Sequence, residues 1–368
     1  MNRVILIGNG FDLAHKLKTR YQDFIDDFWE KEKAIIRLVK DNTDYSYKYE
    51  DEIIQIRSPL EITDLEKSID IRAKGYDWFK ELSTSLKHPV YINGRNIPLR
   101  IEYKNIFLKI ISEQRKLQNW VDIEEEYYLA LYECLNDKLN KKVRRLNEEF
   151  SAIQKALEGY LMIQTEKYPK PLLRIKKNIF PEIYNGDFDA FRGRTLLLSF
   201  NYTTTEKSYI QRTKALLKEH GITTPLLVDV IHIHGELNSH NNPMIFGYGD
   251  EVGDKYKIIE DKNENIYLEN IKSFKYSDAY NYKNLLKFIE DDKYEIFIMG
   301  HSCGISDRTL LKVVFEHRNC VSIKIFYHKR GDDTDNYGDI YKNISRNFSD
   351  KSLMRDRIVV KPESRMLS

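Results

Sequence analysis

The chain has 368 residues, 41% of them hydrophobic, which is enough to bury a sizeable core in one or two domains. Its 59 Lys and Arg residues nearly balance 57 Asp and Glu residues, so the net charge is only +2. Because phosphate contacts need a concentrated cationic face, this balance argues against a nucleic-acid partner. The three cysteines form no C-x-x-C pair, which excludes a four-thiolate zinc ribbon and a disulfide framework and indicates free thiols.

The sequence offers no signal for a membrane. No apolar run approaches the length needed to span a bilayer, and the chain opens directly on a strand-like segment without the regions of a signal peptide. We therefore expect a cytoplasmic protein with no membrane partner.

The first segment is an apolar run, Val4 to Ile7, that leads directly into Gly8-Asn9-Gly10. An apolar run without alternation is typical of a strand buried on both faces, as in a parallel sheet. The two glycines allow a sharp turn and a close approach of the backbone to a ligand, although the third glycine of the dinucleotide fingerprint is missing. Asp12 follows and can cap or bond locally before the next residues.

The middle of the chain is mostly helical by pattern, with one candidate hairpin at residues 90–97 that turns at Asn-Gly. Within the helical residues 103–164, an apolar stripe alternates steps of three and four residues. The stripe could pair two protomers or a defence partner, or pack on a neighbouring helix of the same chain. Its members are Leu139, Val143, Leu146, Phe150, Ile153, Leu157 and Tyr160. The basic residues Lys141 to Arg145 beside it are accounted for by a solvated helix face.

Beyond residue 192 short apolar strands alternate with helices. The strands are expected near residues 195–200, 226–235, 244–250, 295–300 and 321–328. This alternation predicts right-handed crossovers and a doubly wound, mostly parallel Rossmann-like α/β sheet. We predict a core of residues 1–23 plus 192–330, a large helical insertion of residues 24–191, and a polar C-terminal tail of residues 331–368.

Polar residues follow the ends of several predicted strands. These are Gly8-Asn9-Gly10, Asn201, His232, His234 and Gly300-His301-Ser302. Ligands of such sheets bind at the carboxyl ends of the strands, so we expect one shared site at this rim. Strand alternation predicts that His232 and His234 point to the same face, where they could bind a metal, bond in the core or act as an acid or base. No carboxylate-rich ligand set is spaced beside them, so we expect no metal.

An ordered set of motifs resembles the AbiH family, a bacterial family associated with abortive infection of phage-infected cells. The resemblance spans Val4 to about Phe326. The motifs are Ile5 to Leu13 with Lys18 to Tyr21, Trp120 to Glu124, Ser199 to Thr203, Ile233 to Gly235, Phe246 to Asp250, and Gly300 to Ser302.

A more distant likeness implies a chemistry. The order of a Gly-x-Gly loop, a strand ending in Asn, a strand ending in His-Gly and a strand ending in Gly-x-Ser is similar to the sirtuin-like fold, which binds NAD across its strand ends. Protein deacylation is not implied, because the zinc module is missing.

The likeness to the sirtuin-like fold assigns a role to each motif. Gly8, Asn9 and Gly10 would admit the pyrophosphate. The segment from Phe11 to Tyr21, with Asp12 and Thr19, would cover the nicotinamide end. Asn201 would hold the ribose or water, His234 would act as a base, and Gly300, His301 and Ser302 would contact the adenosine side.

The sequence thus predicts an anti-phage protein that cleaves the N-glycosidic bond of NAD+ with Asn201 and His234, NAD being the substrate. Two alternatives stay open at this level. One is a sensor of NAD or ADP-ribose without turnover, or a partner-dependent defence subunit. The other is a metal-dependent nuclease or RNA-directed toxin, with His232 and His234 on a metal and the Lys141 to Arg145 patch on phosphates. The sequence alone does not choose between His232 and His234.

Overall fold

The computed structural model describes residues 1–39, 48–51, 54–57, 69–70, 90–92, 95–97, 100–113, 120–165, 169–187, 193–223, 225–251, 253–331 and 334–367. The chain divides into two compact units. The first comprises residues 1–19 and 158–368, and the second comprises residues 20–157.

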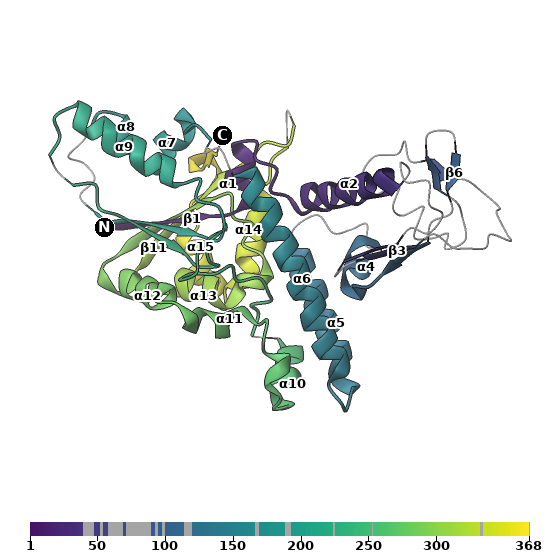
Figure 1. The fold of residues 1–368 in the computed structure, drawn as a ribbon. Coiled ribbons are helices and arrows are strands. Elements are labelled where there is room, and N and C mark those ends of the chain that lie inside the picture. The colour runs from purple at the N-terminus through teal and green to yellow at the C-terminus, as the bar shows by residue number, and fades with distance from the viewer. Residues whose placement is uncertain are drawn as a thin grey trace. The chain divides into compact units, whose positions relative to one another are not determined.

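The first unit is built on a six-stranded sheet (Figure 1) in which every strand pairing is parallel. The spatial order is β12-β11-β10-β1-β8-β9. The strands are β1 (Asn2–Ile7), β8 (Thr195–Ser199), β9 (Val228–His232), β10 (Tyr294–Met299), β11 (Cys320–Tyr327) and β12 (Arg365–Met366).

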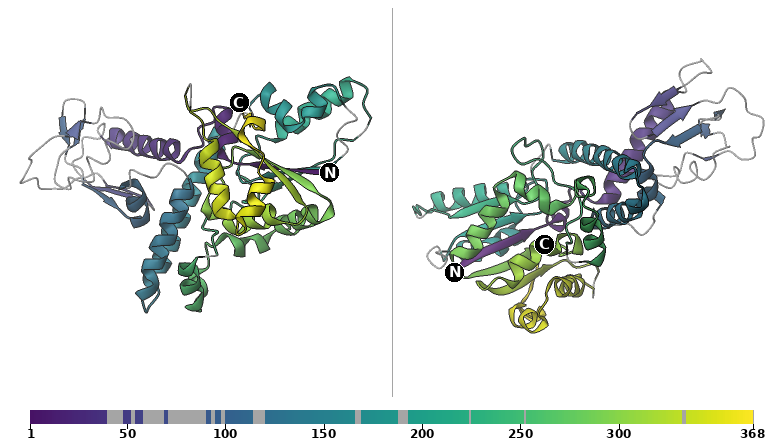
Figure 2. Two further views of the ribbon diagram at one scale, coloured as in Figure 1. Left: turned by 180° about the vertical axis from the view of Figure 1, so that it is seen from behind. Right: turned by 90° about the horizontal axis from the view of Figure 1, so that it is seen from below.

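Helices cover both faces of this sheet (Figures 1 and 2), which explains why every residue of the central strand β1 is buried. Val4 and Leu6 join a core on one face, beneath α12 (Asn281–Asp291), α13 (Arg308–Glu316), α14 (Tyr337–Asn347) and α15 (Lys351–Arg357). Ile5 and Ile7 join a core on the other, beneath α1 (Asn9–Ala14), α7 (Leu173–Ile179), α8 (Pro181–Tyr184) and α9 (Lys207–Glu219). The predicted Rossmann-like α/β fold is confirmed.

The order of the strands locates the crevice at which such folds bind ligands. From β1 the chain adds β8 and β9 on one side, then returns to place β10, β11 and β12 on the other. Strand order therefore reverses between β1 and β10, and the crevice beyond their carboxyl ends is the expected binding position.

The second unit contains helices and two small sheets. Its helices are α2 (Tyr21–Val39), α4 (Ile106–Glu113), α5 (Trp120–Glu133) and most of α6 (Lys141–Gln164). One sheet joins β2 (Lys48–Glu50), β3 (Ile54–Arg57) and β7 (Arg100–Tyr103), and the other joins β4 (Ile69–Asp70), β5 (Val90–Ile92) and β6 (Arg95–Ile97). Strands β5 and β6 pair antiparallel, as predicted for the hairpin, whereas its Asn-Gly turn lies outside the described residues.

The apolar stripe of α6 is buried within the chain except at its first member, since Leu139 is 69% exposed. Phe150, for example, packs on Phe107 and Tyr127. The stripe therefore packs on neighbouring elements of its own chain, which is one of the two alternatives drawn from the sequence.

Residues 331–368, expected as a polar tail, carry α14, α15 and the edge strand β12. Tyr337, Ile340 and Ile344 of α14 are buried in the core of the sheet.

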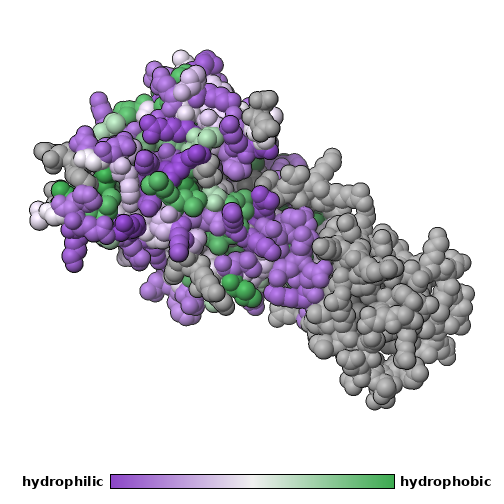
Figure 3. All heavy atoms as spheres, turned by 90° about the horizontal axis from the view of Figure 1, so that it is seen from above, coloured by the Kyte–Doolittle hydropathy of each residue, from purple (hydrophilic) through white to green (hydrophobic). Residues whose placement is uncertain are grey.

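The remaining helices of the first unit are α10 (Asp254–Asp261) and α11 (Lys272–Lys275), with short 3-10 turns. Among the described residues that Figure 3 colours, hydrophilic side chains predominate and hydrophobic side chains form small separate groups.

Candidate functional site

The loops after β1 and β10 meet in close backbone contact at the reversal of strand order. The Gly10 N–H donates to the Gly300 carbonyl at 2.8 Å. A Cβ on Gly8 would lie 2.5 Å from the His301 Cα, and one on Gly300, which has φ of +81°, would lie 2.1 Å from the Phe11 nitrogen. These three positions need glycine because the two loops touch each other.

Asn201 ties the end of β8 to both neighbouring strands. Its Nδ2 donates to the Gly8 carbonyl at 3.0 Å, and its own carbonyl lies 3.0 Å from Nδ1 of His232. The side chain is held in a buried position, with 8% of the residue exposed. The sequence prediction that Gly8, Asn201 and His232 come together at one rim agrees with these contacts.

His232 forms a buried pair with a carboxylate that follows β8. Its Nε2 lies 3.1 Å from Oε1 of Glu206, and both side chains are almost fully buried. Burial alone lowers the pKa of His232, but the hydrogen bond and the negative charge of Glu206 outweigh it, so the pKa is raised overall. Because both ring nitrogens of His232 have partners, this residue has a structural hydrogen-bonding role.

His234 does not share the surroundings of His232, so the prediction that both point to the same face is wrong. Strand β9 ends at His232, and the following residues form a turn in which Gly235 has φ of +86°. His234 therefore contacts a different carboxylate, with its Nε2 3.2 Å from Oδ1 of Asp307.

Asp307 is the centre of a buried group, the Asp307 cluster, that consists of Asp307, Lys272, His234 and His301. Lys272, only 1% exposed, places Nζ 2.9 Å from Oδ1 of Asp307, while Nε2 of His301 lies 3.5 Å from Oδ2. Burial alone raises the pKa of Asp307, but the positive charge of Lys272 and the contact with His234 hold it well below its usual range. The carboxylate is thus ionised and largely neutralised by Lys272.

His234 is neutral within this cluster. Burial, followed by the positive charge of Lys272, lowers its pKa to about 4, although the charge of Asp307 and the contact with it act in the opposite direction. With its Nε2 toward Asp307 and the Tyr276 hydroxyl, Nδ1 has no hydrogen-bond partner among the described residues. The arrangement is a neutral imidazole oriented by a carboxylate, with one nitrogen left to accept a proton.

The structure also shows the contacts of His301 and Ser302 in the predicted Gly300-His301-Ser302 motif. His301 accepts the Cys303 N–H on Nδ1 at 3.0 Å, which leaves its proton on Nε2, facing Asp307. The rings of His301 and His234 both pack on Phe200, at centroid distances of 4.0 and 5.1 Å. Ser302 is exposed and its carbonyl accepts from Asn343 at 2.8 Å.

The predicted residues of the first loop and helix lie in several environments. The hydroxyl of Thr19 donates to Oδ1 of Asn9 at 2.5 Å. Phe11 is fully buried and packs on His15 and Tyr209. Tyr21 belongs to the second unit, where its hydroxyl donates to the Ile111 carbonyl at 3.4 Å.

Asp12 is a buried acid between the ends of β1 and β8. Its Oδ2 accepts from the Thr203 hydroxyl at 2.6 Å, whereas Oδ1 has no hydrogen-bond partner among the residues that the structure describes. Burial, with a smaller contribution from the charge of Glu206, raises the pKa of Asp12 to about 6. Hydrogen bonds from Thr203 and Thr205 oppose this shift only in part.

Sequence reasoning missed Lys272, Asp307, Glu206 and Tyr276. None of them directly follows a strand, which was the only pattern used. Asp307 ends the 3-10 turn Ile305–Asp307 in the loop that begins at Gly300, so a search extended to the whole loop after β10 could have found it. Lys272, in contrast, starts the short helix α11 within a polar stretch, and no sequence signal marks it as buried.

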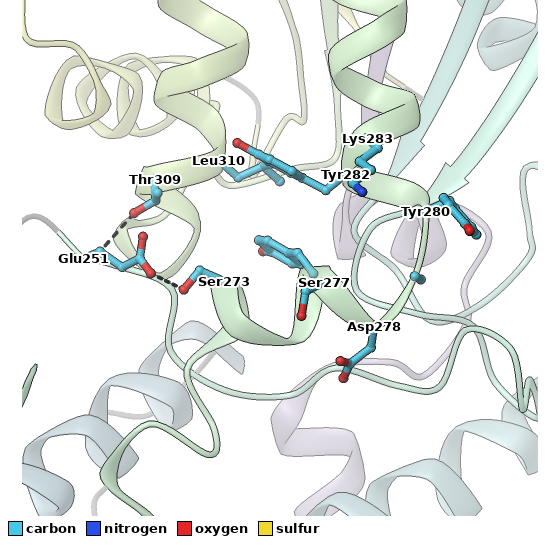
Figure 4. A pocket seen from close by; sticks show the side chains of 11 residues that line it. Glu251, Ser273, Ser277, Asp278, Tyr280, Tyr282, Lys283, Thr309 and Leu310 are labelled. Carbon is cyan, nitrogen blue, oxygen red and sulfur yellow. Dashed lines mark hydrogen bonds between the residues drawn. The ribbon is translucent and has the colours of Figure 1, made fainter. Parts of the chain in front are cut away.

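A cavity of about 570 Å³ lies beside the Asp307 cluster. Tyr276 joins the two, since its ring lines the cavity and its hydroxyl lies 3.3 Å from Nε2 of His234. The other lining residues come from the segment around α11, the start of α12 and the start of α13 (Figure 4): Glu251, Ser273, Ser277, Asp278, Ala279, Tyr280, Tyr282, Lys283, Thr309 and Leu310.

Two observations on the described residues concern a membrane and a metal ion. No described helix combines the length and hydrophobicity that crossing a membrane requires. The described residues also contain no group of three or more His, Cys, Asp or Glu side chains arranged to hold a metal ion.

Comparison with known proteins gives one family. The family model described as bacteriophage abortive infection AbiH matches residues 4–329, a range that includes most of β1, all of β8, β9, β10 and β11, and every residue of the Asp307 cluster. No curated protein matches the chain.

Proposed function

This chain belongs to the AbiH family of bacteriophage abortive-infection proteins, and we propose that it defends the cell by cleaving the bond between nicotinamide and ribose in NAD+. The family indicates a phage-defence protein. The dinucleotide substrate rests on the Rossmann-like sheet and on the side chains at its carboxyl edge.

The observation that carries this proposal is the state of His234. Asp307 orients a neutral imidazole whose Nδ1 has no partner among the described residues, and the ring lies beside a cavity of about 570 Å³. His232 is less suited to take a proton, because both of its nitrogens are already bonded. These contacts favour His234 over His232 as the base.

The reaction requires little acid–base help. The C1′–N bond breaks, its electron pair neutralises the pyridinium, and nicotinamide leaves as a neutral molecule without being protonated. Water then adds to C1′ of the oxocarbenium-like ribose, and Nδ1 of His234 takes the proton that water loses. Because such a C1′ is strongly electrophilic, a weak base is sufficient. Asn201, fixed on the Gly8 carbonyl, would position the ribose or the attacking water.

The two glycine loops support the proposal less strongly than His234 does. Gly8-Asn9-Gly10 and Gly300-His301-Ser302 stand at the reversal of strand order, where a pyrophosphate is expected. Their contact with each other already requires glycine at Gly8, Gly10 and Gly300. Asn201 and His234 are less than a tenth exposed, so a substrate can reach them only after a neighbouring side chain such as Tyr276 moves.

The proposal is tested by incubating the purified protein with NAD+, alone and with an extract of phage-infected cells, and measuring nicotinamide by chromatography. The wild type should release nicotinamide, and His234→Ala and Asn201→Ala should each lower the rate by about a hundredfold or more. His220→Ala, a change of an exposed histidine at the end of α9, should keep the wild-type rate.

The pH profile adds a second readout. Since the pKa of His234 is about 4, turnover should persist down to about pH 5 and disappear as the imidazole is protonated near pH 4. A wild type that is inert under both conditions, or full turnover in both variants, would refute the hydrolase. Binding of ADP-ribose without nicotinamide release would assign the role of a sensor instead.

A further inference from the structure

The cavity beside Tyr276 has the position of a second subsite. Thr309 and Leu310 in its wall lie two and three residues after Asp307, and Tyr276 in its wall contacts His234. A dinucleotide with its ribose at His234 could therefore place another of its parts in this cavity. At about 570 Å³ it lies within the range of ligand sites.

Two stacked tyrosine rings line this cavity. Tyr276 and Tyr282 lie with their centroids 5.9 Å apart and their planes within 8° of parallel. Both residues are half-buried, so their rings are held by packing while part of each faces the cavity. Stacking on such rings is the usual way in which proteins bind a flat heteroaromatic base.

Glu251 supplies a polar group at one end of the cavity, next to Thr309, with Asp278 and Tyr280 at the other end (Figure 4). Its Oε1 accepts a hydrogen bond from Ser273, and its backbone N–H donates to the Thr309 hydroxyl at 3.2 Å. Its Oε2 has no hydrogen-bond partner among the described residues, and Figure 4 shows it directed away from Ser273.

The charge of Glu251 reaches the aromatic wall. Burial raises the pKa of the Tyr282 hydroxyl, and the negative charge of Glu251 raises it further. A fixed carboxylate oxygen beside a stacking surface can only accept hydrogen bonds. It therefore selects a base that presents an amino group and disfavours one that presents a carbonyl oxygen at the same position.

We propose that this cavity binds the adenine base of the dinucleotide, with Tyr282, itself backed by Tyr276, stacking on the ring and Glu251 accepting from its exocyclic amino group. The proposal rests on the proposed function only in that it takes NAD+ as the natural ligand. It adds a specificity for adenine over hypoxanthine, in which a carbonyl oxygen replaces the amino group.

The test measures binding of AMP and of IMP to the full-length protein by calorimetry. The wild type should bind AMP about tenfold more tightly than IMP, because IMP would place two acceptors against each other. Glu251→Gln should bring the two affinities close together, since an amide both donates and accepts. Tyr282→Leu should weaken both nucleotides to a similar degree. The matched control is Glu363→Gln, an exposed carboxylate outside the cavity, which should keep the wild-type ratio.

Equal binding of AMP and IMP by the wild type, no binding of either, or an unchanged ratio in Glu251→Gln would overturn the assignment. Thermal melting of each variant separates loss of binding from loss of folding. Nicotinamide release from NAD+ and from its hypoxanthine analogue distinguishes the two proposals. Equal cleavage of both would support the hydrolase and refute the adenine site. Discrimination between AMP and IMP without any cleavage would support the adenine site and refute the hydrolase.

Discussion

His232 and His234, on either side of Ile233, show how strongly one added charge changes the pKa of a histidine. His232 faces Glu206 and has a raised pKa, whereas His234 faces Asp307 and has its pKa lowered to about 4. Both are buried and both lie about 3.2 Å or less from a carboxylate oxygen. The difference is Lys272, which shares the carboxylate of His234 and leaves it little attraction for a second proton.

Removal of Lys272 should make the surroundings of His234 resemble those of His232. In Lys272→Met, Asp307 keeps its charge without its main counter-charge, so we expect the free energy of unfolding to fall by about 3–5 kcal/mol at pH 7. The pKa of His234 should rise, because only the attractive carboxylate remains. The loss should shrink near pH 5 as His234 takes a proton. Urea unfolding at both pH values and NMR titration of the imidazole measure these effects.

Lys272→Arg serves as the control, because it keeps the cation and should retain most of the stability. An unchanged pKa of His234 in Lys272→Met would show that burial alone, and not the charge of Lys272, keeps that histidine neutral.

Asp12 tests the surroundings of His232 and Glu206, the half of the comparison without a lysine. Its pKa is about 6 when folded and 3.8 when unfolded, so between these pH values the folded state holds more protons and stability falls as pH rises. Asp12→Asn removes this dependence, and we expect it to be more stable than the wild type by about 3 kcal/mol at pH 7.5 and equal to it near pH 4. Urea unfolding at the two pH values compares it with Asp278→Asn, an exposed change that should have no effect.

If Asp12→Asn were destabilising at pH 7.5, the Asp12 carboxylate would have to make a favourable interaction that outweighs the free-energy cost of burying its charge.

The smallest expected effect comes from Glu206→Gln, which removes the charge beside His232. The raised pKa of His232 means that its pairing stabilises the fold below pH 6.5, the unfolded value, and that this contribution disappears as pH rises through the folded pKa. We expect the variant to lose about 1.5 kcal/mol at pH 6 and less above pH 8. Titration of His232 should give a pKa below 6.5. A loss of the same size at both pH values would mean that shape, and not charge, explains the pair.

Much of the fold follows from local pattern. The apolar runs of β1, β8, β10 and β11 predict a parallel sheet because strands buried on both faces carry little else. The meeting of Gly8, Asn201 and Gly300 follows in turn, since parallel strands end at one edge. In α14 the spacing of Tyr337, Ile340 and Ile344 is a helical signal that a composition-based view of the C-terminal residues overlooks.

The chemistry of the site could not be derived in this way. His234 obtains its neutral state from burial and from the charge of Lys272, and its orientation from Asp307, all of which arise only through tertiary packing. The alternation rule failed for His232 and His234 because it holds only inside a strand, and β9 ends between them. Burial and the partners that packing supplies, rather than a residue's own type, set each pKa.

The central position of β1 has a consequence for how the protein is made. Its two neighbours begin at Thr195 and Tyr294, whereas β1 itself begins at Asn2. At translation rates of about 5–20 residues per second, β1 waits on the order of 15–60 s after its own synthesis before β10 can pair with it. Until then the crevice between their loops does not exist. An incomplete chain therefore lacks this edge of the sheet, so every residue up to β10 must be made before the Gly8 and Gly300 loops can meet.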